Sequence, residues 1–410
     1  MNPPDRNPFR PTPGASPLVL AGRDTEIGFL LARLDEAPEI PADVRLTGSR
    51  GMGKTVLLKR FQEGAEERSW VTLPIDLDAR FNYETELIAL LTNSSVRKRE
   101  TLSALVATRR RIGEVAGAVL RSVNLSVGDW TASLDPKFGE ATVDLARPIV
   151  EVVETGIDAG KAGVLYAIDE AQFLKDDPES GEFTLSLLLS TFTQLQVARL
   201  PIALVLSGLP ELDKVLGHTR PQTERLFRGL AIDTLDDAAS TEALIGPLRG
   251  SKIAFDARVV ELVLPEMAGY PHFIQVYGAE LWAAAHNRGA KRVTQKLLGE
   301  TLPAIRTRIR VDIYDFRMRQ LSPSQRDLLI AASRLGPPPI TVDQLSVSAS
   351  PGEDPQAACD ALVQLGVIVD RADRGEFTYT VPGFHDYLLN RADAWSSALP
   401  AARWDDWTLR

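Results

Sequence analysis

Between residues 44 and 235 the chain alternates short apolar runs with longer stretches of helical spacing. Most of the short runs are apolar along their whole length, which is typical of strands in a parallel sheet covered by helices on both faces. Strands are predicted at residues 44–47, 70–76, 163–168, 201–207 and 231–234. The alternation predicts an α/β fold with a five-stranded parallel sheet.

A different pattern follows residue 235. An apolar stripe recurs at intervals of three and four residues, which predicts a helix, and it consists of Leu302, Ile305, Ile309, Ile313 and Phe316. Helices are then expected at residues 325–335, 342–347 and 355–365, followed by two strand-like runs around residues 373–375. This order predicts a winged helix.

These patterns divide the chain into five parts. They are an extended segment (1–21), the α/β core (22–235), a helical region with a connecting helix (236–319), the winged helix (320–391) and a tail (392–410). The first segment is rich in Pro, Asn and Gly, so it should be loosely ordered unless it docks on the body. The tail carries Trp395, Trp404 and Trp407, and we expect it to pack somewhere.

Charge and cysteine content narrow the possible functions. A net charge of −9 argues against a protein that coats nucleic acid or anionic membrane with its whole surface, although a local basic patch remains compatible with it. The single cysteine, Cys359, cannot form an internal disulfide. Neither a signal peptide nor an apolar run of about 20 residues is visible, so we expect a cytoplasmic protein.

A phosphate-binding loop lies between the first predicted strand and the helix after it. Residues 44–58 read VRLTGSRGMGKTVLL and fit the pattern G-x-x-x-x-G-K-[ST]. The glycines let backbone N–H groups face phosphate, Lys54 should reach the β- and γ-phosphates, and the Thr55 hydroxyl should bind magnesium. The predicted ATP and Mg²⁺ contacts are Gly48, Ser49, Arg50, Gly51, Met52, Gly53, Lys54 and Thr55. The fold is therefore expected to be that of a P-loop NTPase.

Two further strand ends carry candidate chemistry. The apolar strand of GVLYAIDEAQFL ends in Asp169, which should hold the magnesium ion through a water, and Glu170 should act as general base toward the attacking water. The alternative for this pair is a solvated acidic strand end. Ser207 ends the strand in LPIALVLSGLPEL and could hold the γ-phosphate or the attacking water, or could belong to an ordinary Ser-Gly turn.

Taken in order, these segments resemble the AAA+ superfamily, in the branch of origin-recognition-type initiators, transposition ATPases and STAND signalling ATPases. The motifs that carry the resemblance are Gly22-Arg23-Asp24, GSRGMGKT, AIDEAQ, SGLPEL, TERLF, GYPHFIQ and the terminal winged helix. The resemblance implies a helical lid, ATP bound where the lid meets the sheet, and Ser207 as a polar sensor residue.

The resemblance also implies an arginine supplied by one subunit to its neighbour's γ-phosphate, and hence an oligomer in the ATP-bound state. Arg225 is the first match and Arg228 the second, and either could instead form a surface ion pair. In Gly269-Tyr270-Pro271, Pro271 would approach the base or sugar of ATP, or the motif could serve as a helix-capping turn. The lid arginine of many AAA+ proteins is absent after this motif, so slow turnover is expected.

Local charge bears on the choice of partner. Residues 321–390 of the winged helix include four basic and nine acidic residues, and its second main helix, 355–365, contains no Lys or Arg. Phosphates would be repelled there, so docking of a protein is favoured over direct reading of DNA. A basic segment at 97–111 could face DNA or could be a solvated helix face. The primary hypothesis is an ATP-dependent switch, and the alternatives are a DNA-associated loader or regulator and a nucleotide-binding scaffold with little turnover.

Overall fold

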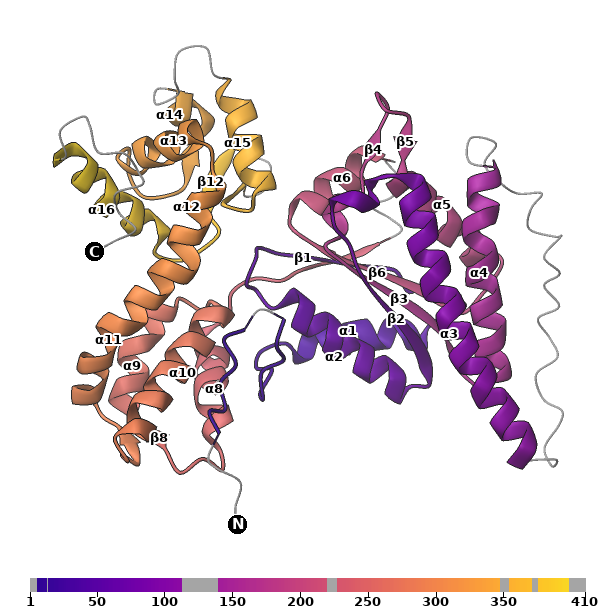
Figure 1. The fold of residues 1–410 in the computed structure, drawn as a ribbon, viewed down its shortest axis with the longest axis horizontal. Helices are drawn as coiled ribbons and strands as arrows, with labels where there is room; N and C mark the ends of the chain where they lie inside the picture. The colour runs from indigo at the N-terminus through magenta and orange to yellow at the C-terminus, as the bar shows by residue number, and fades with distance from the viewer. Residues whose placement is uncertain are drawn as a thin grey trace. The chain divides into compact units, whose positions relative to one another are not determined.

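The computed structural model describes residues 6–12, 14–112, 139–219, 227–346, 354–370 and 375–397 (Figure 1). The chain forms two compact units. The α/β unit comprises Arg23–Gly48 and Gly53–Ile232, and the second unit comprises Met1–Gly22, Ser49–Met52 and Asp233–Arg410. The short piece 49–52, which is the tip of the phosphate-binding loop, thus groups with the second unit.

A five-stranded parallel sheet is the centre of the α/β unit, in the order β2-β3-β6-β1-β7. Its strands are β1 (Val44–Thr47), β2 (Trp70–Asp76), β3 (Gly163–Asp169), β6 (Ile202–Gly208) and β7 (Arg228–Ala231). The predicted five-stranded sheet is confirmed. The fifth strand, however, begins three residues earlier than predicted, because Arg228 pairs with Val44 and Ala231 already reaches the end of β1 at Thr47.

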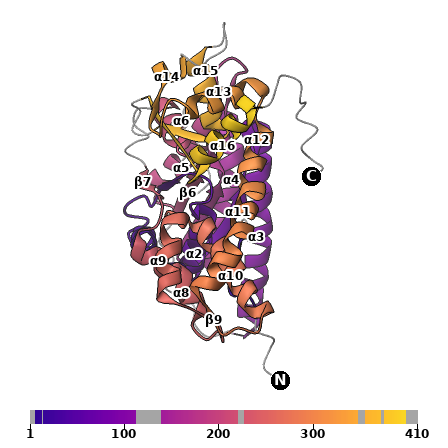
Figure 2. The ribbon, with the colours of Figure 1, turned by 90° about the vertical axis from the view of Figure 1, so that its left-hand side faces the viewer.

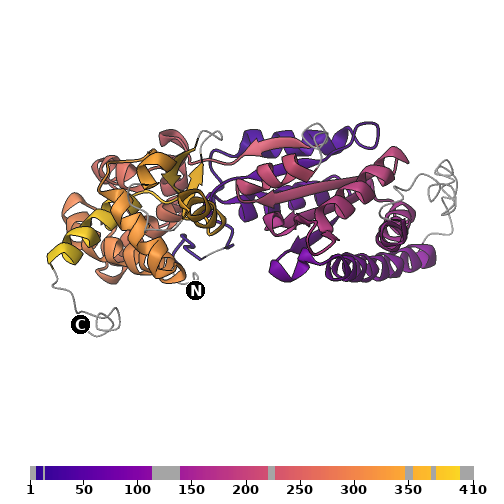
Figure 3. The ribbon, with the colours of Figure 1, turned by 90° about the horizontal axis from the view of Figure 1, so that it is seen from above.

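Helices cover both faces of this sheet (Figure 3). One face carries α1 (Asp24–Asp35) and α2 (Lys54–Glu67), and the other carries α3 (Glu84–Ile112), α4 (Gly139–Asp158), α5 (Thr184–Val197) and α6 (Glu211–Thr219). The division follows from right-handed crossovers: β1 to β2 runs across the sheet in one direction, and the later connections run back in the other. Polar groups buried in this unit also form hydrogen bonds. The buried hydroxyl groups of Tyr166 and Ser95, for example, lie 2.7 Å apart.

Small elements surround the end of β3. The short helix η3 (Ala171–Phe173) follows that strand directly and leads to a hairpin of β4 (Asp176–Asp177) and β5 (Glu182–Phe183). Another short helix, η1 (Ala79–Asn82), follows β2. The Asn82 side chain accepts hydrogen bonds from the Lys175 backbone and from the Thr184 hydroxyl, so the segments after β2 and β3 are held together.

Helices also make up the first part of the second unit (Figures 1 and 2). They are α8 (Asp237–Ile245), η4 (Gly246–Leu248), α9 (Ala257–Met267), α10 (Pro271–Asn287) and α11 (Gln295–Ile309), with a small parallel pair of β8 (Ala254–Phe255) and β9 (Arg292–Val293). The N-terminal segment docks here, because Asn7 donates to the Ala279 carbonyl and the Phe9 ring stacks on Phe255.

The last described part is a winged helix. A π-helical segment, η5 (Arg310–Asp315), and α12 (Phe316–Gln320) lead into it. It contains α13 (Pro323–Ser333), β10 (Ile340–Thr341), α14 (Val342–Ser346), α15 (Pro355–Gln364), β11 (Ile368–Asp370), β12 (Glu376–Tyr379) and α16 (Phe384–Ser397). The strands form an antiparallel sheet in the order β10-β12-β11, which confirms the predicted wing.

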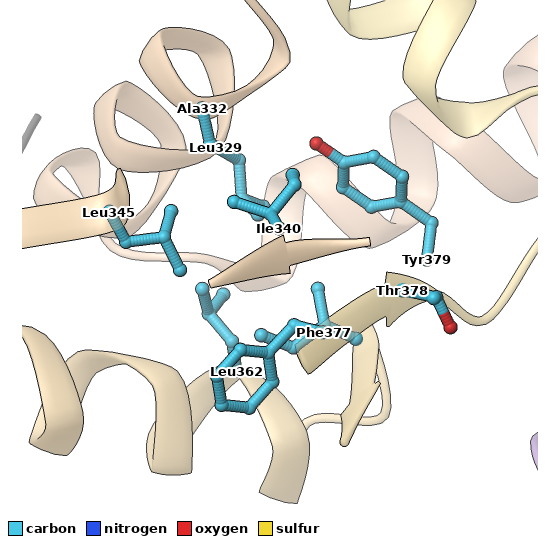
Figure 4. Close-up of a pocket in the computed structure, with 9 residues that line it drawn as sticks. Leu329, Ala332, Ile340, Leu345, Leu362, Phe377, Thr378 and Tyr379 are labelled. Carbon is cyan, nitrogen blue, oxygen red and sulfur yellow. The ribbon is translucent and has the colours of Figure 1, made fainter. Parts of the chain in front are cut away.

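Apolar side chains of the winged helix line a cavity of about 10 Å³ (Figure 4). Leu329, Ile340, Leu362 and Phe377 converge on it. A space of that size holds about one water molecule at most, so it is a packing gap of the core and not a ligand site. Trp404 and Trp407 lie outside the described residues, as does the side chain of Trp395. None of the helices in the described part of the chain has the length and apolarity needed to cross a membrane.

Candidate nucleotide site

The phosphate-binding loop connects the end of β1 to the start of α2. Gly53 lies at the N-cap of α2 with φ 88°, a left-handed conformation that favours glycine. Gly48 is needed for a different reason, because a Cβ at this position would lie 2.3 Å from the carbonyl oxygen of Ile232. The N-terminus of a helix presents backbone N–H groups and a positive dipole end, and this makes the start of α2 suited to binding an anion.

Lys54 is the first residue of α2, and its side chain is almost fully buried. The Nζ atom donates a 2.7 Å hydrogen bond to the carbonyl oxygen of Gly48, across the loop. A buried ammonium at the start of a helix adds its charge to the positive end of the helix dipole, which gives the loop a concentrated positive potential. The loop therefore has the electrostatic character that a polyphosphate requires.

Asp169 joins three elements at the carboxyl end of the sheet. Its carboxylate accepts hydrogen bonds from the Thr55 hydroxyl at 2.6 Å, the Ser207 hydroxyl at 2.7 Å and the Glu170 backbone N–H at 3.0 Å. Asp169 and Ser207 are both buried. β3 and β6 are neighbours in the sheet, so the structure brings together Thr55, Asp169 and Ser207, which lie far apart in the sequence.

The oxygen atoms at this point suit a magnesium ion shared with phosphate. Mg²⁺ prefers oxygen ligands and keeps several waters, so a protein usually supplies only one or two carboxylate or hydroxyl groups. Thr55 and Asp169 already lie within hydrogen-bonding distance of each other. The described residues contain no cluster of three or more His, Cys, Asp or Glu that could hold a metal ion.

Glu170 follows Asp169 with φ 55°, a conformation that non-glycine residues rarely adopt. Its carboxylate accepts a 2.5 Å hydrogen bond from the side-chain amide of Gln172. A third acid, Asp76, ends β2 in register with Asp169, and its pKa is raised by partial burial and by the charges of Asp169 and Glu170.

Sequence reasoning did not identify Gln172 or Asp76 as site residues. Asp76 could have been found, because it ends an apolar strand in the same way as Asp169 does. Gln172 carries a weaker signal, since only its place two residues after Glu170 in AIDEAQ distinguishes it from other glutamines.

The tip of the loop makes its contacts inside the second unit. The Tyr270 hydroxyl donates a 2.7 Å hydrogen bond to the carbonyl oxygen of Arg50. Gly51 permits this approach, because a Cβ there would lie 2.0 Å from the Tyr270 hydroxyl oxygen. Pro271 is the first residue of α10, and Gly269 precedes the pair with φ 66°. The predicted Gly-Tyr-Pro motif thus reaches the loop through Tyr270, while Pro271 starts a helix.

The two candidate arginines stand apart from the groups above. Arg225 lies outside the described residues. Arg228 is exposed at the first position of β7, opposite Val44 at the start of β1. The phosphate-binding loop follows the other end of β1. Arg228 therefore lies at the amino-terminal ends of the parallel strands, whereas the loop of the same chain lies at their carboxyl ends.

The family model described as "AAA ATPase domain" matches residues 19–205, which contain the loop, Asp169 and Glu170. Over this segment the chain is similar to the AAA ATPase domain family. Members of the family are P-loop NTPases that bind ATP with Mg²⁺. The AAA ATPase segment covers all strands of the central sheet except β7 and the last three residues of β6.

Solved structures resemble the whole described fold. The Walker-type ATPase PABY2304 of Pyrococcus abyssi has a TM-score of 0.55 and 20% identity, with 90% of this chain and 96% of that chain covered. The ADP form of the Aeropyrum pernix ORC2 protein has a TM-score of 0.51 and 15% identity, with 95% and 98% covered. At these identities the likeness concerns the fold alone. No curated protein matches the sequence.

Proposed function

We propose that this chain hydrolyses ATP with Mg²⁺ and acts as a molecular switch, in which the nucleotide state controls engagement of a partner through the winged helix. The observation that carries the proposal is the convergence of Thr55 and Ser207 on the Asp169 carboxylate, with Glu170 directly beside it. It joins the phosphate-binding loop to the ends of two strands. A bound phosphate can therefore act on several elements at once.

Each residue has a separate role in this proposal. Lys54 binds the β- and γ-phosphates, and Thr55 and Asp169 hold Mg²⁺, which neutralises charge on the phosphates. Glu170 accepts a proton from the water that attacks the γ-phosphate. Ser207 orients Asp169 and senses the γ-phosphate. The loop residues 48–53 supply backbone N–H groups to the phosphates, and Pro271 faces the base or sugar.

The partner in this proposal is a protein with a basic surface. The exposed positions of α15 include Gln356, Asp360 and Gln364, and the helix contains no basic residue. The protein acts in the cytoplasm and assembles into a homo-oligomer when ATP is bound, as a STAND-type switch does. Its working parts are those of the sequence prediction: segment 1–21, core 22–235, lid and connecting helix 236–319, winged helix 320–391 and tail 392–410.

A DNA-associated loader or regulator is the second candidate function, supported by the basic start of the segment 97–111. Arg97 is exposed on α3 and Lys98 is half-buried, whereas Arg99 is paired with Glu151 of α4. The side chains of Arg109, Arg110 and Arg111 lie outside the described residues. Of these three described basic residues, Arg99 is thus already paired with an acid within the protein. Because a paired arginine attracts DNA phosphates less, this favours the switch over the DNA-associated function. A nucleotide-binding scaffold with little turnover is the third candidate.

Phosphate release by wild type, Lys54→Ala and Glu170→Gln tests the proposal. Loss of a charged hydrogen-bond donor should weaken ATP binding by Lys54→Ala about 10- to 100-fold, measured by calorimetry. Glu170→Gln should bind ATP like the wild type but turn over at least about 100-fold more slowly, because a general base contributes about that much.

Two exposed positions near the site supply matched controls. Glu179→Gln and Lys175→Ala make the same chemical changes in the exposed segment between β3 and α5 and should leave both measurements unchanged. Full turnover by Glu170→Gln would contradict the assigned base, and unchanged ATP affinity of Lys54→Ala would remove the proposed phosphate site. Bound ATP without turnover in the wild type would favour the scaffold.

A further inference from the structure

We infer that Gln172 is a positioning residue for hydrolysis: it orients the Glu170 carboxylate and connects it to the loop after β6. This inference rests on the proposed function, in which Glu170 activates water. Gln172 lies in η3, the short helix that follows Glu170, and all the residues concerned belong to the α/β unit.

Two hydrogen bonds determine the direction of the Gln172 amide. Its Oε1 accepts a 3.1 Å hydrogen bond from the backbone N–H of Leu209, and its Nε2 donates at 2.5 Å to Oε2 of Glu170. A backbone N–H can only donate, so the amide oxygen must face Leu209 and the amide nitrogen must face Glu170. An amide held at both ends gives a carboxylate a defined orientation, which an isolated side chain lacks.

The backbone is shaped to place Gln172 there. Glu170 has the left-handed φ of 55°, and this turns the chain out of β3 so that η3 packs beside the end of β6. On the β6 side, Gly208 provides the space: a Cβ at this position would lie 2.7 Å from the Gln172 Oε1 and 3.3 Å from the Gln172 backbone nitrogen. The close approach therefore depends on glycine at position 208.

The consequence is that Asp169 and Glu170 are both linked to the end of β6, at positions two residues apart. Asp169 accepts a hydrogen bond from Ser207, and Glu170 is reached from Leu209 through Gln172. A displacement of this strand end, for example by a γ-phosphate near Ser207, would be transmitted to the magnesium-binding acid and to the general base together. In this chain of contacts, Gln172 is the residue that bonds the carboxylate of the base.

Gln172→Met tests the inference, because methionine has nearly the same length and volume but neither donates nor accepts a strong hydrogen bond. We expect kcat to fall about 10- to 100-fold, a part of the general-base contribution, with the Kd for ATP within about twofold of wild type. Gln172→Glu, which places a negative charge against Glu170, should be slower still. Gln295→Met, at an exposed position of α11, is the control and should behave like wild type.

Gly208→Ala supplies a second variant in which Gln172 itself is intact. The added methyl group would press on the Gln172 amide, so kcat should again fall with little change in the Kd for ATP. Wild-type or raised kcat in Gln172→Met would overturn the inference, and so would a fall in kcat matched by equal losses of ATP affinity and thermal stability. In the Glu170→Gln background the Gln172→Met change should have no further effect. Turnover retained by Glu170→Gln itself would instead reject the proposed function.

Discussion

Among single residues, Asp43 is a buried acid distant from the proposed chemistry. It directly precedes β1, and its Oδ1 accepts hydrogen bonds from Gln196 Nε2 at 2.7 Å and from the Leu204 backbone N–H at 3.0 Å. Burial raises its pKa from 3.8 to about 7, while those hydrogen bonds and the charge of Arg33 act in the opposite direction. Asp43 is therefore expected to be largely protonated in the folded protein at mildly acidic pH.

Asp43→Asn should stabilise the protein increasingly as the pH rises from about 4 to about 7. In that interval the unfolded wild type has lost this proton while the folded wild type retains it, so the free energy of unfolding falls with pH. Asparagine keeps the accepting oxygen and does not ionise. Each tenfold difference in proton affinity corresponds to about 1.4 kcal/mol, so the gain should be on the order of a few kcal/mol at neutral pH.

Urea unfolding of the two proteins at several pH values measures this difference. Asp144→Asn, at an exposed position of the same unit, is the matched control and should show a much smaller change. A stability difference between Asp43→Asn and wild type that stays constant from pH 4 to pH 8 would refute the assignment.

Among elements, helix α3 is the one whose charges distinguish a DNA partner from a protein partner. The helix packs lengthwise against α4, and the Arg99–Glu151 pair links the two (Figure 1). Arg97 remains exposed on the same helix. A solvated helix face with partly neutralised charge is a weak electrostatic site for phosphates.

We therefore expect duplex DNA to change ATP turnover less than about twofold, and Arg97→Glu/Lys98→Glu to leave turnover unchanged. Binding of DNA measured at 50 mM and 200 mM salt provides the decisive comparison. An affinity that falls about 10³-fold over this range indicates six or more phosphate contacts. Such a fall in the wild type, absent from the double variant, would establish the DNA-associated alternative.

At the scale of the whole molecule, the open question is whether the site is completed by a second copy of the chain. Arg228 lies at the amino-terminal ends of the parallel strands, and the phosphate-binding loop of the same chain lies at their carboxyl ends. Arg225, three residues earlier, is the arginine proposed to reach a neighbour's γ-phosphate.

Mixing Arg225→Ala with Lys54→Ala tests this sharing. Arg225→Ala alone should be nearly inactive, because an arginine finger contributes about 10³–10⁵ in rate, and Lys54→Ala alone should be slow because it binds ATP weakly. In a mixed oligomer some sites combine an intact Lys54 with an intact Arg225, so phosphate release should exceed that of either variant alone. The Arg228→Ala variant mixed in the same way serves as comparison. The absence of rescue at every mixing ratio would count against a shared site.

Much of the fold was predictable because its signals are local. The winged helix and four of the five strands of the central sheet follow from runs of apolar residues and their spacing, and the loop around Lys54 follows from the positions of its glycines. The fifth strand was misplaced by three residues, because β7 is an edge strand with little buried surface, and its register is set by pairing with β1.

By itself, then, the sequence determined that a phosphate-binding loop precedes a helix, that two acids end a buried strand, and that an acidic winged helix follows. These are properties of neighbouring residues, in which backbone conformation and solvent exposure depend on local composition. Only the tertiary structure decided that Ser207 and Thr55 meet on Asp169, that Gln172 links Glu170 to Leu209, and that Asp43 is buried. Those contacts depend on strand order and side-chain direction, which arise when distant segments pack together.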